Sequence, residues 1–159
     1  MTSASKPVRR QSLASSRLRK HADYLRAYAA GRKRQSAAIS WFFAPQTQEA
    51  EAKVAAPTLP APARVGLTVG KVIGKAHARN RIKRRVREAL RRHVDLLPAG
   101  FDLIFHPRRS VLTMEFAQLE REIVRILEQA QEQSLVEAAR SAKRNSTLSS
   151  PKARVTPAP

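Results

Sequence analysis

The chain contains no cysteine, so disulfide bonds, cysteine-ligated zinc sites and a thiol nucleophile are all excluded. It also lacks a long apolar run. The longest apolar stretch, at 37–44, is interrupted by Ser40 and is far too short to span a bilayer. The basic N-terminus has no apolar segment of the length found in signal peptides. We therefore expect a cytoplasmic protein without a membrane-spanning segment.

Acidic residues are scarce: 12 Asp and Glu stand against 31 Lys and Arg, which gives a net charge of +19. Repulsion among so many basic side chains destabilises the compact state, and a small enzyme acting on a metabolite would gain nothing from it. A nucleic-acid-binding protein would, because each neutralised phosphate releases counterions. Binding to a membrane surface would need a sustained amphipathic helix with large apolar residues, and none stands out. The composition thus favours a nucleic-acid partner.

Side chains suited to catalysis or metal binding are few and dispersed. No set of them has the spacing of a metal site, a carboxylate dyad or a nucleophile with its base. The histidines fall in different parts of the chain, at His21, His77, His93 and His106. Of these, His93 lies on an apolar helical face and is interpreted as a packed histidine, not a ligand. We predict no catalytic residue and no metal site within the chain.

Length and pattern predict one domain with tails. Short segments in which apolar residues alternate with others, or which are rich in aromatic residues, predict strands at 39–44, 64–69 and 101–106. Helical patterns precede the first strand, separate the last two and follow the third, which indicates helices on a sheet of three or four strands. The predicted organisation is a disordered basic tail at 1–14, a single domain at 15–135 with a mobile loop at 45–63, and a disordered basic tail at 136–159.

The first and last helices are predicted from apolar repeats. The first begins after Ser15 or Ser16, ends at Gly31 and buries Leu18, Ala22, Leu25 and Ala29. The last is capped by Thr113 and buries Phe116, Leu119, Ile123, Ile126 and Leu127. In the first helix, Tyr24 and Tyr28 lie beside the predicted apolar stripe, at about a quarter turn or more. They either form a stacking surface for unpaired bases or widen the core face.

The stretch 71–93 holds ten Lys and Arg but a single acid, Glu88. Ile82, Val86, Ala89, Leu90 and His93 share one helical face, which we expect to pack on the core. The rest is basic, and arginine supplies planar bidentate contacts to phosphate. The helix N-terminus after Gly74 adds free backbone N–H groups. The predicted RNA-binding residues are Lys71, Lys75, Arg79, Asn80, Arg81, Lys83, Arg84, Arg87 and Arg91, while the flank of Arg81, Arg85 and Arg92 is expected to be free for a second contact.

A spaced set of these residues resembles the signature of a known family, the protein component of bacterial ribonuclease P. The set comprises Arg64-Val-Gly-Leu-Thr-Val69, Lys71, Gly74, Ala76, Arg79-Asn80-Arg81, Lys83-Arg84 and Arg87-Glu88. Further similarity extends it over roughly residues 17–130, through Tyr24, Tyr28 and Gly31 on one side and Phe101 and Phe116 on the other.

The resemblance implies both a fold and a function. The fold would be an α/β (α+β) two-layer sandwich, with a small mixed sheet, a left-handed βαβ crossover and helices packed on it. The protein would be a subunit that binds a catalytic RNA and the 5′ leader of precursor tRNA, supporting removal of that leader. The active site would be in the RNA, and Mg²⁺ would be held by the RNA and substrate. No protein partner is implied, and the leader cleft would contain Tyr24, Tyr28 and Phe42.

Two other functions fit parts of the sequence. A non-catalytic structural RNA-binding protein, such as a ribosome-associated one, is equally compatible with the composition, but the spaced signature argues against it. A DNA-binding protein would need a helix-turn-helix partner for the basic helix, and the strands predicted on either side of 71–93 do not provide one.

Overall fold

The computed structural model describes residues 13–46 and 61–148. Most of the predicted loop at 45–63 and of the predicted N-terminal tail therefore lies outside the described residues, as does 149–159. Within the described ranges, no helix is both long enough and apolar enough to cross a membrane.

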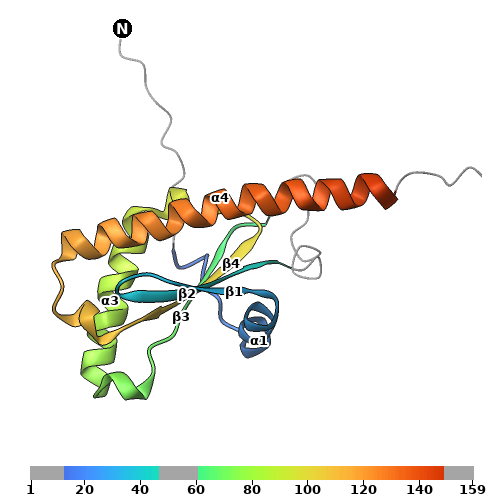
Figure 1. Cartoon of the computed structure of the whole chain (residues 1–159). Helices are drawn as coiled ribbons and strands as arrows, with labels where there is room; N and C mark the ends of the chain where they lie inside the picture. The colour runs from blue at the N-terminus through green and yellow to red at the C-terminus, as the bar shows by residue number, and fades with distance from the viewer. Residues whose placement is uncertain (1–12, 47–60, 149–159) are drawn as a thin grey trace, which may run out of the picture.

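A four-stranded mixed sheet forms the centre of the molecule (Figure 1). Its order is β1-β2-β4-β3, with antiparallel pairing except between β3 and β4, which run parallel. Helix α3 connects β3 to β4 and so completes the expected βαβ unit. The strands are β1 (Arg32–Gln35), β2 (Ile39–Pro45), β3 (Arg64–Leu67) and β4 (Phe101–Pro107).

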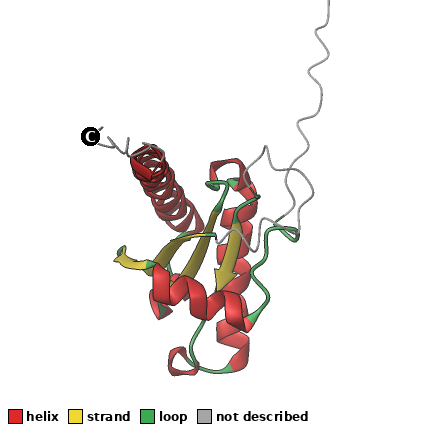
Figure 2. Ribbon diagram, turned by 90° about the vertical axis from the view of Figure 1, so that its right-hand side faces the viewer, coloured by secondary structure: helices red, strands yellow, loops and turns green. Residues whose placement is uncertain are grey.

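Helices cover both faces of the sheet (Figure 2). Alternation along the strands points Trp41, Leu103 and Phe105 toward α3 and α4, while Phe42 and Ile104 point toward α1. The mixed α+β fold is thus confirmed, with α1 adding cover on the second face. The helices are α1 (His21–Ala30), α3 (Ala76–Arg92) and α4 (Phe116–Leu148), with 3₁₀ turns η1 (Lys71–Ile73), η2 (Val94–Leu96) and η3 (Arg109–Leu112).

The main core lies between the sheet and the α3/α4 pair. The predicted apolar face of α3 is buried there at Ile82, Val86, Ala89 and Leu90. Most of the predicted stripe of α4 is also fully buried, at Leu119, Ile123, Ile126 and Leu127, with Phe116 packed at its edge. Both predictions are confirmed, because each depends only on helical spacing.

The prediction for the first helix is wrong in its start and in its buried face. The helix begins at His21, and the segment before it pairs with the edge of β3: Leu18 N–H donates to Val65 O at 2.9 Å, and Val65 N–H donates to Ser16 O at 2.6 Å. Leu25 is 55% exposed, whereas Asp23 and Ala27 are buried. The apolar repeat gave a wrong prediction because it counted Leu18 as part of the helix. Leu18 is buried, but it lies in the extended segment before the helix.

Two further boundaries differ from the predictions. Residues 32–35 form the edge strand β1, although their charge indicated a basic connector. Helix α4 begins at Phe116 without a cap from Thr113, and it continues to Leu148, so 136–148 is helical where a disordered tail was predicted. The distal part of α4 consists mostly of residues with good helix propensity, namely Ala, Leu, Gln, Glu, Lys and Arg, so the helix continues although no described residue beyond Ala130 is buried.

Candidate nucleic-acid interface

Helix α1 is attached to the sheet by a buried ionic network. Arg64 donates to both oxygens of Asp102, at 2.8 and 2.7 Å, and to Asp23 of α1 at 3.2 Å. The bidentate contact with Asp102, together with Asp23, raises the pKa of the Arg64 guanidinium despite its partial burial. Because Asp23 lies one residue before Tyr24, this network determines how α1 presents its tyrosines.

An aromatic face lies between α1 and the sheet; we use this name for Tyr24, Tyr28, Phe42 and His106. The Tyr28 ring meets Phe42 edge to face at 4.8 Å and lies 6.4 Å from the Tyr24 ring. Tyr28 Oη and His106 Nε2 are hydrogen-bonded at 2.9 Å. The three predicted leader-cleft residues are therefore brought together. They pack on a small apolar cluster yet remain half-exposed, so they combine the two interpretations left open by the sequence.

Gly66 of β3 allows the Tyr24 ring to rest directly on the sheet. A Cβ at this position would lie only 2.7 Å from Tyr24 Cε1 and 2.9 Å from its Oη. Burial against the strand raises the pKa of the Tyr24 phenol, while the Leu67 backbone and the charges of Arg17 and Arg87 act in the opposite direction. Tyr24 is thus held at the junction between the sheet and the basic helix.

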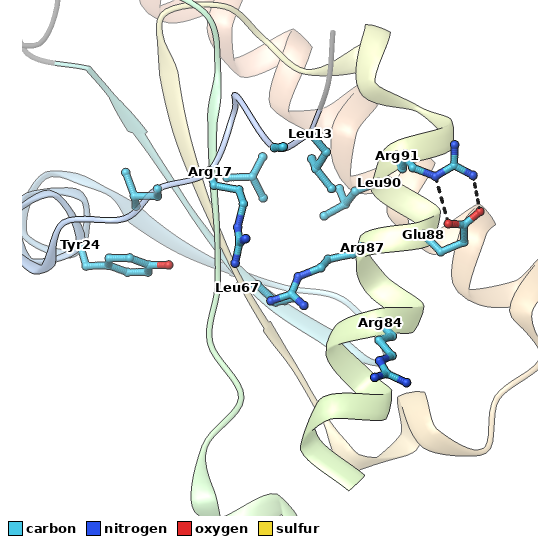
Figure 3. A pocket seen from close by; sticks show the side chains of 12 residues that line it. Leu13, Arg17, Tyr24, Leu67, Arg84, Arg87, Glu88, Leu90 and Arg91 are labelled. Atoms are coloured by element: carbon cyan, nitrogen blue, oxygen red, sulfur yellow. Dashed lines mark hydrogen bonds and ion pairs between the residues drawn. The ribbon is translucent and has the colours of Figure 1, made fainter. Parts of the chain in front are cut away.

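A basic pocket of about 480 Å³ opens beside Tyr24, between the segment preceding α1, strand β3 and helix α3. Figure 3 shows Arg17 and Arg87 reaching toward each other from opposite walls, next to Leu67 and the Tyr24 hydroxyl. Among the described residues, no ion pair joins either arginine to an acid. Two converging unneutralised guanidinium groups beside a phenol suit a phosphate next to an unpaired base.

The remaining predicted RNA-binding residues divide into three groups. Arg84 and Arg91 line the basic pocket with Arg87, although Arg91 also pairs with Glu88 at 2.7 Å. Arg79 and Lys83 are half-buried on the turns of α3 that precede Arg87, at spacings of four residues. The others lie outside the pocket with exposed side chains: Lys71, Lys75, Asn80 and Arg81.

The start of α3 has a form suited to an anion. Gly74 has a φ of 145°, a conformation that favours glycine, and it redirects the chain from η1 into the helix. Lys75 occupies the N-cap position, and its side chain makes no capping hydrogen bond. The first backbone N–H groups of α3 therefore lack a side-chain cap, as the sequence predicted.

Arg85 is not free for a second contact, contrary to the prediction for that flank. Its guanidinium donates to the backbone carbonyls of Val111, Leu112 and Met114. Arg92 is also engaged, with Glu88 at 3.3 Å, Glu120 at 3.5 Å and the Phe116 ring below it. Apart from Glu88, which is on the same helix, charge spacing within α3 could not reveal these partners, since they lie some 20 to 30 residues further along the chain.

The described residues contain no group of three or more His, Asp or Glu side chains that could hold a metal ion. His93 is half-buried at the end of α3, where its Nε2 hydrogen-bonds Glu120 at 2.8 Å.

Comparison with known proteins places this geometry in context. A family model described as Ribonuclease P matches residues 14–131. The ribonuclease P protein component of Chloroflexus aggregans is 36% identical over 117 residues, which cover 73% of this chain and 78% of that protein. The Staphylococcus aureus RNase P protein has a TM-score of 0.58 at 25% identity, over 73% of this chain and 95% of that one. The Thermotoga maritima RNase P protein has a TM-score of 0.58 at 26% identity, over 71% and 96%.

Proposed function

This chain belongs to the ribonuclease P protein family, and from that premise we propose how its surfaces serve the enzyme. The chain is the protein subunit of a ribonucleoprotein endoribonuclease that processes tRNA. Its RNA partner is proposed to be the catalytic RNA, and its substrate precursor tRNA, in the cytoplasm. The subunit binds the 5′ leader and so supports the cut that forms the mature tRNA 5′ end. The active site is in the RNA.

The leader path is proposed to run from the basic pocket onto the aromatic face. The observation that carries this proposal is the convergence of Arg17 and Arg87 beside Tyr24. Proteins that bind single-stranded nucleic acid combine a basic groove for the backbone with aromatic side chains on which bases stack. Tyr24, Tyr28 and Phe42 supply the stacking surface, and the arginines hold the phosphates that enter it.

The catalytic RNA is proposed to contact the outward side of α3. Asn80 and Arg81 are exposed on the first turns of α3, Lys71 and Lys75 are exposed just before it, and the uncapped start of the helix lies among them. Arginine and lysine neutralise phosphates, while the Asn80 amide can reach a base edge or a 2′-hydroxyl. One helix thereby faces the substrate with one flank and the RNA subunit with another.

The Mg²⁺ that hydrolysis requires is proposed to be held by the RNA and the substrate. This assignment fits a chain in which the buried acids of the described residues are engaged within the protein, such as Asp102 with Arg64 and Glu122 with the Ala38 N–H. What the protein contributes is binding: it neutralises phosphates near the leader and positions the substrate on the RNA.

Replacing Tyr24 and Arg87 separately tests the leader path in the reconstituted holoenzyme. Tyr24→Ala is expected to reduce the preference for precursor over mature tRNA by a stacking loss on the order of 1–3 kcal/mol. Arg87→Gln is expected to weaken binding and to lower the salt slope by about one unit for one lost phosphate contact. Affinities for both tRNAs, measured at several salt concentrations, supply the readout.

Arg125→Gln is the matched control, because Arg125 is exposed on α4, away from the pocket. If Tyr24→Ala lowered only the melting temperature and left the precursor preference intact, Tyr24 would belong to the core alone and the path would be wrong. Sequencing the RNA that co-purifies with the tagged protein tests the wider assignment. One discrete noncoding RNA is expected, and ribosomal RNA in its place would contradict it.

A further inference from the structure

A second basic groove lies on the other face of the sheet, between the edge strand β1 and the distal part of α4. Its volume is about 730 Å³. Arg32 and Arg34 form one wall: they pair across the strands with Phe43 and Trp41, and therefore project to the α4 side. Arg34 is placed over the Trp41 ring, 5.8 Å from its centroid. The groove is thus separated by the sheet from the aromatic face.

Helix α4 forms the opposite wall with a single stripe of side chains. Ala130 is the last residue of α4 that is fully buried, and beyond it the helix continues past the sheet (Figure 1). The residues facing the groove recur at intervals of three, four and seven, the spacing of one helical face: Gln133, Val136, Glu137, Arg140, Lys143 and Arg144. In the first half of α4, the inward stripe is apolar; here three of its six residues are basic and one is acidic.

The charges lining this groove do not balance. Five cationic side chains line it, Arg32, Arg34, Arg140, Lys143 and Arg144, against one acid, Glu137, which pairs with Arg144 at 3.3 Å. Two walls of like charge that face each other repel unless an anion lies between them. Phe43 on the sheet and Val136 on the α4 wall, which is 47% exposed, add apolar surface. A polyanion with a partly apolar backbone matches such a lining.

We propose that this groove binds the sugar–phosphate backbone of RNA, as a second RNA-binding surface on the face of the sheet opposite the aromatic face. Arginine favours phosphate through planar bidentate contacts, and the apolar surface accommodates ribose. The proposal rests on the proposed function in one respect: it takes RNA as the polyanion that occupies the groove. The family match ends at residue 131, so the whole α4 wall of the groove lies beyond it.

Two double variants test the groove with equal loss of charge. Arg140→Gln with Lys143→Gln removes two exposed cations from the groove; Arg121→Gln with Arg125→Gln removes two exposed cations from another face of the same helix. Glutamine keeps the helix favourable in both. The groove variant is expected to lower the slope of log affinity against log salt by about one unit per lost phosphate contact, with little change in the control.

The source of the RNA is resolved by the order of addition. If the groove variant has a lower salt slope for binding the catalytic RNA alone, the groove contacts the RNA subunit. If the slope is lowered only when precursor tRNA is added, the groove contacts the substrate. An equal decrease of the salt slope in both double variants, or no decrease in the groove variant, would overturn the proposal. The basic residues would then serve only to keep the edge strand β1 from pairing with other chains. In either case the precursor preference that tests the leader path is measured separately, so failure of one proposal is distinguishable from failure of the other.

The absence of cysteine permits a direct mapping experiment. A chelated iron attached to Lys143→Cys generates hydroxyl radicals at the groove, and the same probe on Arg125→Cys serves as the control. Discrete cleavage of the RNA is expected from position 143, at sites different from those of the control. Cleavage no greater than with free chelate would contradict an RNA backbone in the groove.

Discussion

At the scale of single residues, much of the ionic chemistry is used to hold the fold. Arg64 joins Asp23 to Asp102, and Glu122 accepts hydrogen bonds from Ser36 Oγ and the Ala38 N–H at 2.6 and 2.7 Å. A buried carboxylate is stable only when its oxygens are satisfied in this way. These acids are therefore unavailable to oppose the basic surface, and the arginines of the pocket remain open to phosphate.

His106 should make the stability of the free protein depend on pH. Burial on the aromatic face, and secondly the nearby Lys33, lower the pKa of His106 below its usual value of about 6.5. The unfolded chain then binds more protons between the two pKa values, so the contribution is fully present above about pH 6.5 and is lost as the pH falls toward the folded pKa. We expect urea denaturation to show falling stability over that window.

His106→Asn is the matched comparison, because it removes the titrating group. The slope of stability against pH below about 6.5 should be shallower in the variant, whatever its absolute stability. An NMR titration of His106 in the wild type supplies a second check. Identical slopes in the two proteins, or a His106 pKa at or above 6.5, would show that protonation is not opposed by its burial.

At the scale of elements, α3 packs on the core with one side and presents basic side chains on the others. Ile82, Val86 and Leu90 bury one side of it, and Arg85 ties it to the segment that leads into α4 through three backbone carbonyls. The flank toward β3 keeps Arg87 over the basic pocket. The charge of the helix is therefore divided: Arg85 is engaged by backbone carbonyls and Arg91 and Arg92 by acids, whereas Arg87 forms no ion pair with an acid among the described residues.

Arg85→Met tests this division, because methionine keeps the apolar stem and removes the donors. We expect the variant to lose about 1–3 kcal/mol of unfolding free energy, since carbonyls that lose a charged donor are left unsatisfied. Arg81→Met, on the exposed surface, should change stability by no more than about 0.5 kcal/mol. The order should reverse for RNA affinity, where Arg81→Met is the more harmful. Chemical denaturation and RNA titration measure the two effects, and equal stability losses would refute the structural role of Arg85.

At the scale of the whole molecule, the net charge of +19 destabilises the free protein. Long-range repulsion among exposed cations opposes compactness, and a bound polyanion relieves it. Both RNA-binding surfaces proposed above, one on each side of the sheet, reduce the same repulsion when they are filled. Folding of the isolated subunit and binding of RNA are thereby coupled through electrostatics.

Salt should therefore affect the free protein and its RNA complex in opposite directions. Between about 0.01 M and 0.15 M salt the screening length falls from about 30 Å to about 8 Å, which weakens repulsion between surface charges. The melting temperature of the free subunit is expected to rise over this range, while its affinity for RNA falls. Thermal denaturation without RNA, followed by titration under the same conditions, measures both. A free-protein melting temperature that stays flat or falls would mean that net repulsion does not limit stability.

The sequence by itself determined what depends on local spacing and on composition. The three predicted strands lie within a few residues of their expected positions, and the predicted apolar faces of α3 and α4 are buried. Both predictions succeed because the periods of two and 3.6 residues can be read from residues that are close together in the sequence. The excess of basic residues indicated a polyanion before any fold was known. The spaced signature around Arg79-Asn80-Arg81 then indicated the family, which the comparisons confirmed.

Only the tertiary structure decided which charges meet. Asp23 and Arg64 are 41 residues apart, and Arg64 and Asp102 are 38 apart, so no local pattern could pair them. The same holds for Arg17 and Arg87, which converge only after residues 16–18 have paired with β3. It also holds for Arg85, whose partners come from another element. Spacing along the chain determines which face a side chain occupies, but its partner is determined by the packing of elements that are distant in sequence.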